Sequence, residues 1–394
     1  MSRDSSQDDP NWSSSTRQLR AGHDPSNAHG FVNPPTVRGS TVLFPDTATM
    51  RRRGQPFTYG LRGTPTLRAL EAAIDELEGS HGTVLVPSGL AAVSLPLLAF
   101  LSAGDHCLVV DSVYGPTRLF CDTMLKRLGV ETEYFDPAIG AGLRALMRPN
   151  TRVVLLEAPG SNTFEILDVR EAADIARAGG AVSMLDNTWA TPLYFRPLDF
   201  GVDLSIHALT KYPGGHSDLL MGSVSATKDT FDRLRDAQMQ LGINVSADDA
   251  YLVFRGMKTM GVRLPAHRDA ALQLAAWLET RDEVARVLHP ALPSFPSHDL
   301  WRRQFGGSSG LFSFVLAGGG RREAAAFLDA LRLFGLGYSW GGFESLALEV
   351  DLSDRLFAKA PSEGPVIRLQ VGLEDVKDLQ TDLEAGFEAL RDLS

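Results

Sequence analysis

The feature of this sequence that most restricts its fold is an alternation of short apolar runs with amphipathic segments between residues 66 and 226. The apolar runs read TVLVPS, HCLVVD, VETEYF, RVVLLEA, AVSMLD, LSIHAL and GSVSAT. The amphipathic segments, which we expect to be helices, include residues 66–79, 89–101, 115–128 and 169–178. Runs that are apolar along their length and joined by helices indicate a mostly parallel sheet covered on both faces. Ligands of such sheets bind beyond the carboxyl ends of the strands.

The residue composition and the hydrophobic pattern divide the chain into three parts. Residues 1–60 form a Ser- and Asp-rich tail, expected to be disordered for about 15 residues, and then an extended Pro-, Gly- and Thr-rich arm. Such an arm needs a surface to lie against, and a neighbouring subunit is a natural candidate. Residues 61–257 form a large α/β domain. Residues 258–394 form a smaller α+β domain, in which a helix over residues 265–280 precedes the strand-like runs VARVLH, GLFSFVLA and VIRLQV and a final helix.

Composition narrows the range of partners. The chain has 48 acidic residues against 38 Lys and Arg, a net charge of −10, which disfavours nucleic acid; the one basic cluster, Arg51–Arg53, is typical of a solvated loop. Cys107 and Cys121 lie in apolar surroundings and are expected to be buried thiols in a reducing compartment. The polar N-terminus has no apolar core for export, and no run is long enough to span a membrane. We therefore expect a cytoplasmic protein.

Two neighbouring segments contain a lysine and an aspartate in the pattern of a pyridoxal phosphate (PLP) site. Lys211 lies in DLSIHALTKYPGGHSD, and Asp186 ends the apolar run of AVSMLDNTWATP. A lysine amine can form a Schiff base with the cofactor aldehyde, while an aspartate pairs with the pyridine nitrogen. The alternative is that Lys211 is an ordinary solvated lysine. Its apolar approach and its glycine exit favour the cofactor.

The remaining parts of PLP also find partners in the sequence. In VPSGLAAVSLPLLAF, a strand ends at Pro87, and Ser88 and Gly89 open a helix whose free N–H groups suit the phosphate, although an ordinary capped helix has the same pattern. Thr210 could add a hydroxyl to the phosphate. Tyr114, in DSVYGPTRLF, is placed to stack on the ring.

A substrate carboxylate calls for an arginine, because a guanidinium group matches a carboxylate in bidentate geometry. Arg368 lies in the apolar strand VIRLQV, where an inward-facing arginine needs a counter-ion. The alternative is an arginine at a sheet edge, which needs none. The sequence therefore makes Arg368 the candidate that binds a small-molecule amino-acid substrate.

The residues also allow two other classes of function. His207, His216 and Asp218 lie within twelve positions and could suggest a metal hydrolase, but their spacing fits no metal-ligand pattern, and no metal is expected. A catalytically inactive relative that acts as a binding protein is a further alternative. The presence of Lys211 and Asp186 together argues against it.

Several motifs, in the same order along the chain, resemble those of the Cys/Met-metabolism PLP enzymes, which are fold type I enzymes of transsulfuration. The resemblance begins near residue 17. The motifs that carry it are SGLAAV, DSVYGPTR, LEAPGSNT, AVSMLDNTWATP, HALTKY, GYSWGGFESL and IRLQVGLEDVKDL. GYSWGGFESL is most similar to the cystathionine β-lyases, in which a tryptophan follows the serine. Synthases and γ-lyases of the family commonly have a leucine-type residue there.

The resemblance implies a role for each matching residue. Lys211 would carry the cofactor, Asp186 would contact the ring nitrogen and Tyr114 would stack on the ring. The phosphate pocket would be lined by Ser88, Gly89, Leu90 and Thr210. Arg368 and Ser339 would hold the substrate carboxylate, with Tyr338 and Trp340 beside the distal part of the substrate. Tyr59, in FTYGLRGTPT, would reach the phosphate of the neighbouring subunit in a homotetramer with shared active sites.

The sequence departs from the family pattern at three places. Leu61 replaces a common phosphate-binding arginine, and the next residue, Arg62, would point the opposite way on a strand, so its contact with the phosphate is doubtful. Ala208 stands where many members have a phosphate-binding serine. Gln370 replaces a common serine after Arg368. These departures concern the phosphate and the substrate range rather than the core chemistry.

The resemblance implies a carbon–sulfur β-lyase of methionine biosynthesis. Such an enzyme converts L-cystathionine and water to L-homocysteine, pyruvate and ammonia, and one proton abstraction precedes expulsion of the thiolate. A γ-elimination needs a second abstraction, at the β-carbon. The alternatives within the family are a cystathionine γ-synthase, a methionine γ-lyase and a broad cysteine-S-conjugate lyase.

Overall fold

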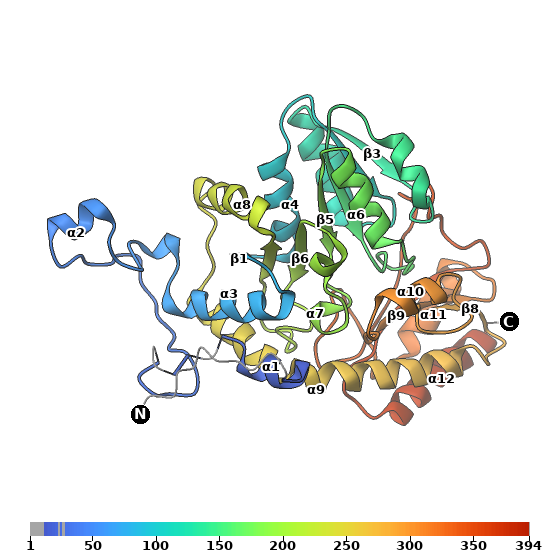
Figure 1. Cartoon of the computed structure of the whole chain (residues 1–394). Coiled ribbons are helices and arrows are strands. Elements are labelled where there is room, and N and C mark those ends of the chain that lie inside the picture. Colours follow the sequence, from blue (N-terminus) through green and yellow to red (C-terminus); the bar gives the residue numbers. More distant parts are fainter. Residues whose placement is uncertain (1–11, 23, 26–27, 394) are drawn as a thin grey trace.

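The computed structural model of the chain describes residues 12–22, 24–25 and 28–393 and has two sheets, each with its own helices (Figure 1). The larger sheet has seven strands in the order β1-β7-β6-β5-β4-β2-β3. Strands β2 to β6 pair in parallel, while β7 is antiparallel to both of its neighbours. The predicted fold class, a mostly parallel sheet covered by helices together with a smaller α+β part, is therefore confirmed. The strands of the larger sheet are β1 Gly82–Val86, β2 His106–Val110, β3 Glu131–Phe135, β4 Thr151–Glu157, β5 Val182–Asp186, β6 Leu204–Ala208 and β7 Gly222–Ala226.

Helices pack on both faces of this sheet, as its apolar strands require. Helix α4 packs against β6 and β7, and α3 packs against β1 and the long helix α9, Ala247–Leu278. The helical elements of this part are α3 Pro65–Glu78, α4 Gly89–Phe100, α5 Gly115–Phe120, the π-helical turn Cys121–Leu125, the 3-10 helix Gly140–Leu146, α6 Val169–Ala178, α7 Thr191–Tyr194, the 3-10 helix Pro197–Phe200 and α8 Lys228–Gln240. Residues 115–128, expected as one helix, thus change to π geometry at Cys121.

The second sheet has five strands in the order β10-β11-β12-β9-β8 and its own apolar core, to which α9, α11 and α12 contribute. Its elements are β8 Val284–Leu288, α10 His298–Gln304, β9 Leu311–Leu316, α11 Arg321–Ala330, β10 Gly335–Leu336, β11 Leu346–Glu349, β12 Val366–Gln370 and α12 Val376–Arg391. Helix α9, Ala247–Leu278, begins well before the expected residue 265 and has Pro265 in its interior. The predicted domain boundary at residue 257 lies inside this helix, so the boundary stays a prediction.

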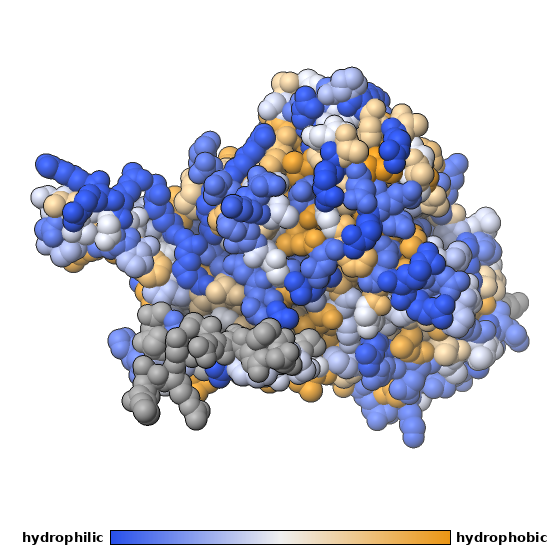
Figure 2. Space-filling model, in the orientation of Figure 1, coloured by the Kyte–Doolittle hydropathy of each residue, from blue (hydrophilic) through white to orange (hydrophobic). Residues whose placement is uncertain are grey.

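The N-terminal arm is more structured than its composition suggests. Part of the tail predicted to be disordered, residues 1–11, lies outside the described residues, but α1 Ser14–Arg20 is helical, and its Gln18 donates a hydrogen bond of 2.5 Å to the Met257 carbonyl. Beyond it the chain is largely extended to α2 Thr47–Arg52, at the end of the arm that projects from the body in Figure 1. That end is mainly hydrophilic in Figure 2. Within the described residues, none of the helices is long and apolar enough to cross a membrane.

Candidate active site

A cavity of about 350 Å³ lies at the carboxyl ends of the central strands, where the two sheets meet. Its walls come from both parts of the molecule, because strand ends of the large sheet face β12 and the loop after β10. It brings together all of the predicted site residues except Tyr59. The lining includes Ser88, Gly89, Leu90, Tyr114, Glu157, Asn162, Asp186, Thr188, Thr210, Lys211, Tyr338, Ser339, Trp340 and Arg368.

Lys211 lies in the turn that follows β6. Its amine Nζ donates a hydrogen bond of 2.6 Å to Ser339 Oγ and lies 5.1 Å from the centre of the Trp340 ring. Burial lowers the pKa of Lys211 to about 8, helped by the charge of Arg368 and opposed by that of Asp186. The main chain comes close here, since a side-chain carbon at Gly341 would lie 3.0 Å from the Lys211 carbonyl carbon. The amine is therefore fixed in place and partly neutral near pH 8.

Asp186 is the last residue of β5, and its two carboxylate oxygens have different surroundings. Oδ1 accepts hydrogen bonds from the Thr188 main-chain N–H (2.9 Å) and hydroxyl (2.5 Å). Asp186 lines the cavity, and within residues 12–22, 24–25 and 28–393 no donor reaches its Oδ2. Burial raises the pKa of Asp186 against the effect of the Thr188 bonds. A cationic N–H group in the cavity would satisfy Oδ2 and favour the ionised form.

The N-terminus of α4 forms another wall of the cavity. Ser88 caps this helix by accepting a hydrogen bond from the Ala91 N–H (3.1 Å). Gly89 packs closely on β6, because a side-chain carbon there would lie 2.6 Å from Ala208 Cβ. The Thr210 hydroxyl lines the cavity and donates a hydrogen bond of 3.1 Å to the Met221 carbonyl. The free N–H groups of the first helical turn, next to Leu90, suit an anion.

Tyr114 follows β2 and extends its ring into the cavity, where the side chain is 45% exposed. Its main-chain N–H donates a hydrogen bond of 2.7 Å to Glu157 Oε2. Burial raises the pKa of the Tyr114 hydroxyl.

Arg368 projects from β12 into the cavity. Nη1 donates to Asn162 Oδ1 and Nη2 to the Ser339 carbonyl, both at 3.2 Å. Within the described part of the chain, no carboxylate pairs with this guanidinium group. Burial lowers its pKa to about 10, so it still carries a full charge at neutral pH. An unpaired, half-buried guanidinium group is a ready site for a carboxylate.

The loop after β10 closes the cavity from the side of the smaller sheet. Ser339 has a φ of 78°, an unusual left-handed conformation for a residue other than glycine. It contacts both Lys211 and Arg368, as given above. Tyr338 is 91% exposed, whereas Trp340 packs on the Tyr212 ring with 5.6 Å between ring centres. Trp340 therefore both packs the interior and faces the cavity.

Tyr59 lies outside this cavity. It is in the projecting arm, 52% exposed, and forms an isolated bridge with Thr41. The next residues, Gly60–Arg62, form a 3-10 helix rather than a strand. The argument from strand alternation against Arg62 is therefore wrong for this segment, because successive 3-10 residues turn by about a third of a circle.

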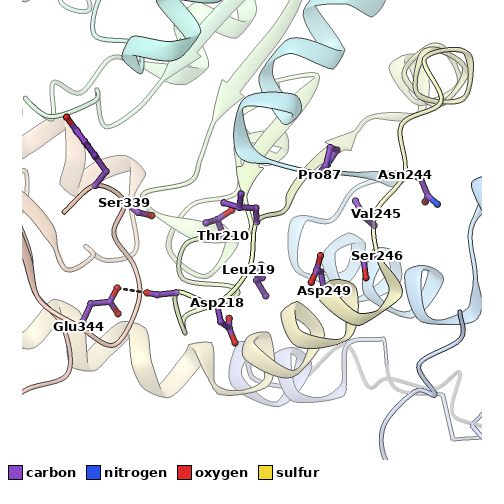
Figure 3. Close-up of a pocket in the computed structure, with 13 residues that line it drawn as sticks. Pro87, Thr210, Asp218, Leu219, Asn244, Val245, Ser246, Asp249, Ser339 and Glu344 are labelled. Carbon is purple, nitrogen blue, oxygen red and sulfur yellow. Dashed lines mark hydrogen bonds between the residues drawn. The ribbon is translucent and has the colours of Figure 1, made fainter.

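A second cavity, of about 730 Å³, adjoins the first and shares Thr210, Leu220, Tyr338 and Ser339 with it (Figure 3). Its walls carry the acidic side chains Asp218, Asp249 and Glu344, and Glu344 accepts a hydrogen bond from Ser217. It has neither the lysine amine nor the free arginine of the first cavity. The smaller cavity is therefore the candidate active site.

The histidines weighed as metal ligands have other contacts. His207 Nε2 lies 3.0 Å from Glu78 Oε1 in the interior, and His216 Nδ1 lies 2.7 Å from the Gly214 carbonyl oxygen. No group of three or more His, Cys, Asp or Glu residues in the described ranges could hold a metal ion.

Among the cavity residues that sequence reasoning missed are the polar residues Glu157, Asn162 and Thr188. Each belongs to a motif that was noticed for another reason, LEAPGSNT or LDNTWATP. The signal that could have found them is position, since Glu157 ends a strand as Asp186 does, and Thr188 and Asn162 follow such ends.

The arrangement defines a PLP-dependent enzyme of the α/β class, with a lysine, a strand-end aspartate and a helix N-terminus around one cavity. A sequence model of the family described as "Cys/Met metabolism PLP-dependent enzyme" matches residues 15–388. The chain belongs to this family.

Similar proteins cover nearly the whole chain. A Rhizobium johnstonii protein, named provisionally as a cystathionine β-lyase, is 64% identical over 95% of this chain and 96% of its own length. The cystathionine β-lyase MetC of Escherichia coli is 44% identical over 94% and 97%. Among solved structures, cystathionine γ-synthase of Xanthomonas oryzae pv. oryzae, in complex with aminoacrylate and cysteine, superposes with a TM-score of 0.90. It is 34% identical and covers 97% of this chain and 99% of that one.

The residues present fit the cofactor of this family. Asp186 Oδ2 has no donor within the described part of the chain, which suits a ring N–H. Gly89 packs closely on Ala208 of β6 and lines the cavity at the N-terminus of α4, beside the free N–H groups of that helix. The Lys211 amine lies in the same cavity. The ring nitrogen, the phosphate and the aldehyde of PLP thus each have a partner of matching chemistry.

Proposed function

We propose that this protein is a PLP-dependent carbon–sulfur β-lyase that converts L-cystathionine and water to L-homocysteine, pyruvate and ammonia. The observation that carries the proposal is the position of the Lys211 amine, bonded to Ser339 in one cavity with the unpaired Arg368. One substrate molecule in this cavity could therefore contact both a base, Lys211, and a binding site for its carboxylate, Arg368. The names of the Rhizobium and Escherichia coli relatives support the β-lyase assignment, and the Trp340 motif supports it independently.

The cofactor, when bound, supplies an electron sink for the carbanion left by removal of the substrate α-proton. We assign Asp186 to its ring nitrogen, Tyr114 to its ring face, and Ser88, Gly89, Leu90 and Thr210 to its phosphate. Burial already disfavours an uncompensated charge on Asp186. Binding of a cationic ring there would therefore be favoured by the protein as folded.

The residues of the chain then orient and deprotonate the substrate. Arg368 binds the α-carboxylate as a bidentate pair, held in orientation by Asn162 and the Ser339 carbonyl. Lys211, once its amine is free, takes the α-proton, and its lowered pKa makes the neutral base available near pH 8. Ser339 Oγ holds the amine in place through the 2.6 Å hydrogen bond. One proton transfer precedes loss of the β-thiolate, which a single lysine can accomplish.

The substrate class is tested by comparing kcat/KM for cystathionine, cysteine and methionine with the PLP-saturated protein. We expect cystathionine to have the highest value and methionine the lowest. A higher value for methionine would favour a methionine γ-lyase, and a higher value for cysteine a broad cysteine-S-conjugate lyase. Condensation of cysteine with an activated homoserine would instead indicate a γ-synthase.

Replacing Trp340 with alanine should weaken binding of the long substrate. We expect KM for cystathionine to rise roughly three- to tenfold, the usual value of an aromatic contact, and KM for cysteine to change little. Trp301, on α10 beside His298, is a matched control whose loss should leave the ratio of the two KM values unchanged. Equal effects of Trp340→Ala on both substrates would make Trp340 a packing residue only.

We also propose a homotetramer in which Tyr59 completes the site of a neighbouring subunit. The support is the N-terminal segment of residues 28–60, which exposes Tyr59 together with the apolar Phe31, Val32, Leu43 and Met50. Such side chains on an extended segment indicate a surface that another subunit covers.

Mixing two inactive variants tests whether the sites are shared. Tyr59→Ala and Lys211→Ala subunits, combined in equal amounts and allowed to exchange, should recover about a quarter of wild-type activity. The reason is that, with random pairing, half of the subunit pairs that share active sites contain one subunit of each variant. Each such pair has one native site out of two. Recovery of none, despite exchange demonstrated by mass spectrometry, would remove Tyr59 from the neighbouring site.

Finally, we propose that the enzyme acts in the cytoplasm, in methionine biosynthesis. Cys107 and Cys121 are both free and buried, and burial raises the pKa of Cys121 to about 12. Free thiols are usual in a reducing compartment.

A further inference from the structure

Glu157 is a second carboxyl group in the floor of the active-site cavity, directly beside Asp186. It is the last residue of β4, as Asp186 is of β5, and the two are register partners in the parallel pairing of these strands. Both line the cavity. Two carboxyl groups at neighbouring strand ends cannot both ionise easily in a site shielded from water.

One oxygen of Glu157 has a defined structural task. Oε2 accepts the 2.7 Å hydrogen bond from the Tyr114 main-chain N–H. Tyr114 precedes α5, so this bond fixes the point where the chain leaves β2 and turns its ring toward the cavity. In the described residues, Oε1 accepts no hydrogen bond.

The surroundings of the two acids favour a charge on Asp186 rather than on Glu157. Asp186 accepts two hydrogen bonds from Thr188, whereas Glu157 accepts one from Tyr114. Burial and the charge of Asp186 raise the pKa of Glu157 well above its usual value. The hydrogen bond from the Tyr114 N–H lowers this pKa, and so does the charge of Arg355, from the loop between β11 and β12, but neither outweighs burial.

The other charged groups around Glu157 do not reverse this order. Glu165, in the loop after β4, raises the pKa of Glu157 further. Lys211 and Arg368 line the same cavity, but Lys211 acts on Asp186, and Arg368 has its contacts with Asn162 and Ser339. Neither of these two cations forms an ion pair with Glu157 among the described residues.

We propose that Glu157 is a positioning residue of the cofactor site, whose neutral carboxyl group holds the Tyr114 main chain and leaves Asp186 as the single anion at the floor of the cavity. The inference rests on the proposed placement of the PLP ring between Tyr114 and Asp186. A protonated Glu157 keeps an acceptor for the Tyr114 N–H without adding a second negative charge behind Asp186. A charged Glu157 would give the ring nitrogen two anions and would cost burial of the second.

The first test separates two properties of Glu157: its hydrogen-bond acceptor and its charge. The quantity measured is the Kd for PLP, from quenching of protein fluorescence by added PLP. Glu157→Gln keeps an oxygen acceptor without a charge, so its Kd should stay within about threefold of wild type. Glu157→Leu leaves the Tyr114 N–H without a partner, so its Kd should rise about tenfold or more. Glu165→Gln, the same change at a nearby acid that is outside this cavity, is the matched control and should leave Kd unchanged. If Glu157→Gln weakens PLP as much as Glu157→Leu does, the charge is required and the proposal is wrong.

The second test uses the cofactor-free protein, whose stability reports the proton directly. The pKa of the Glu157 carboxyl group is higher in the folded protein than its unfolded value near 4.5, so the folded state binds more protons. Its contribution to the free energy of unfolding therefore falls as pH rises from about 4.5 toward the folded pKa. The Glu157→Gln variant lacks this loss. Its melting temperature relative to wild type should therefore rise steadily from pH 4.5 to pH 7.5.

A difference in melting temperature that stays flat over this range would show that Glu157 is ionised in the folded protein, and would overturn the proposal. A misfolded Leu variant would be recognised by loss of the cooperative transition, in which case the Gln variant and its pH slope still decide. Failure of the β-lyase assignment would alter the products and leave both readouts unchanged. Failure of the cofactor placement would appear as attachment of PLP to a lysine other than Lys211.

Discussion

Replacing Lys211 with alanine is expected to lower kcat by more than about 10⁴-fold, beyond the contribution of a general base alone, because the same amine also attaches the cofactor. The yellow absorbance of the PLP-loaded protein should disappear as well. Pyruvate release measures the first effect, and the visible spectrum measures the second. In the wild type, reduction with borohydride followed by peptide mapping should place the cofactor on Lys211.

Lys258 provides a matched control for this variant. Burial lowers its pKa to about 8, as at Lys211, but its amine donates to the carbonyl groups of Leu19 and Ala21, away from the cavity. Lys258→Ala should therefore keep its turnover and lose some stability. Substantial activity of Lys211→Ala, or a borohydride label on another lysine, would refute the central assignment.

Replacing Asp186 with alanine is expected to lower kcat roughly 10²- to 10³-fold, comparable to the loss of one preorganised electrostatic contact. The reason is that an unprotonated pyridine ring withdraws electrons poorly. PLP affinity should fall as well, while the melting temperature of the cofactor-free protein should hold or rise, because the variant removes a carboxylate that burial disfavours.

Asp203 is the matched control. It directly precedes β6, at the end of the β5–β6 pair opposite to Asp186. Its Oδ2 accepts hydrogen bonds of 2.8 Å from the Ser183 N–H and hydroxyl. Asp203→Ala should lower the melting temperature and leave kcat unchanged. Equal turnover of Asp186→Ala and wild type would show that another acid serves the ring nitrogen.

Most strands of the large sheet were predictable because their runs are largely apolar, although β3 reads ETEYF and is partly exposed. Once the strands are known to be mostly parallel, their carboxyl ends meet at one edge, so Asp186 and Lys211 were expected there. The convergence of Arg368 on the same cavity was less predictable. It lies in a different sheet, more than 150 residues later, and sequence position does not show how two sheets face each other.

Helix boundaries were predicted less well where local propensity competes with tertiary packing. Pro265 is typical of a first helical turn, yet α9 runs through it, because the helix packs along both parts of the molecule. In the same way, α1 forms in a segment of helix-poor composition because its Gln18 bonds to Met257 of α9. Such long-range contacts override the weak intrinsic preference of seven residues.

Glu157 shows a further limit of sequence reasoning. Its importance depends on the strand register that places it beside Asp186, and on a main-chain hydrogen bond from Tyr114. Neither can be derived from the sequence, because an apolar strand ending in an acid fits several registers.

The most direct test of the proposed reaction is the identity of the 2-oxo acid formed from L-cystathionine by the PLP-loaded protein. Chromatography separates pyruvate from 2-oxobutyrate, and thiol derivatisation separates homocysteine from cysteine. β-Elimination predicts pyruvate and homocysteine in equal amounts. Release of 2-oxobutyrate with cysteine would contradict the β-lyase assignment and make this protein a γ-lyase.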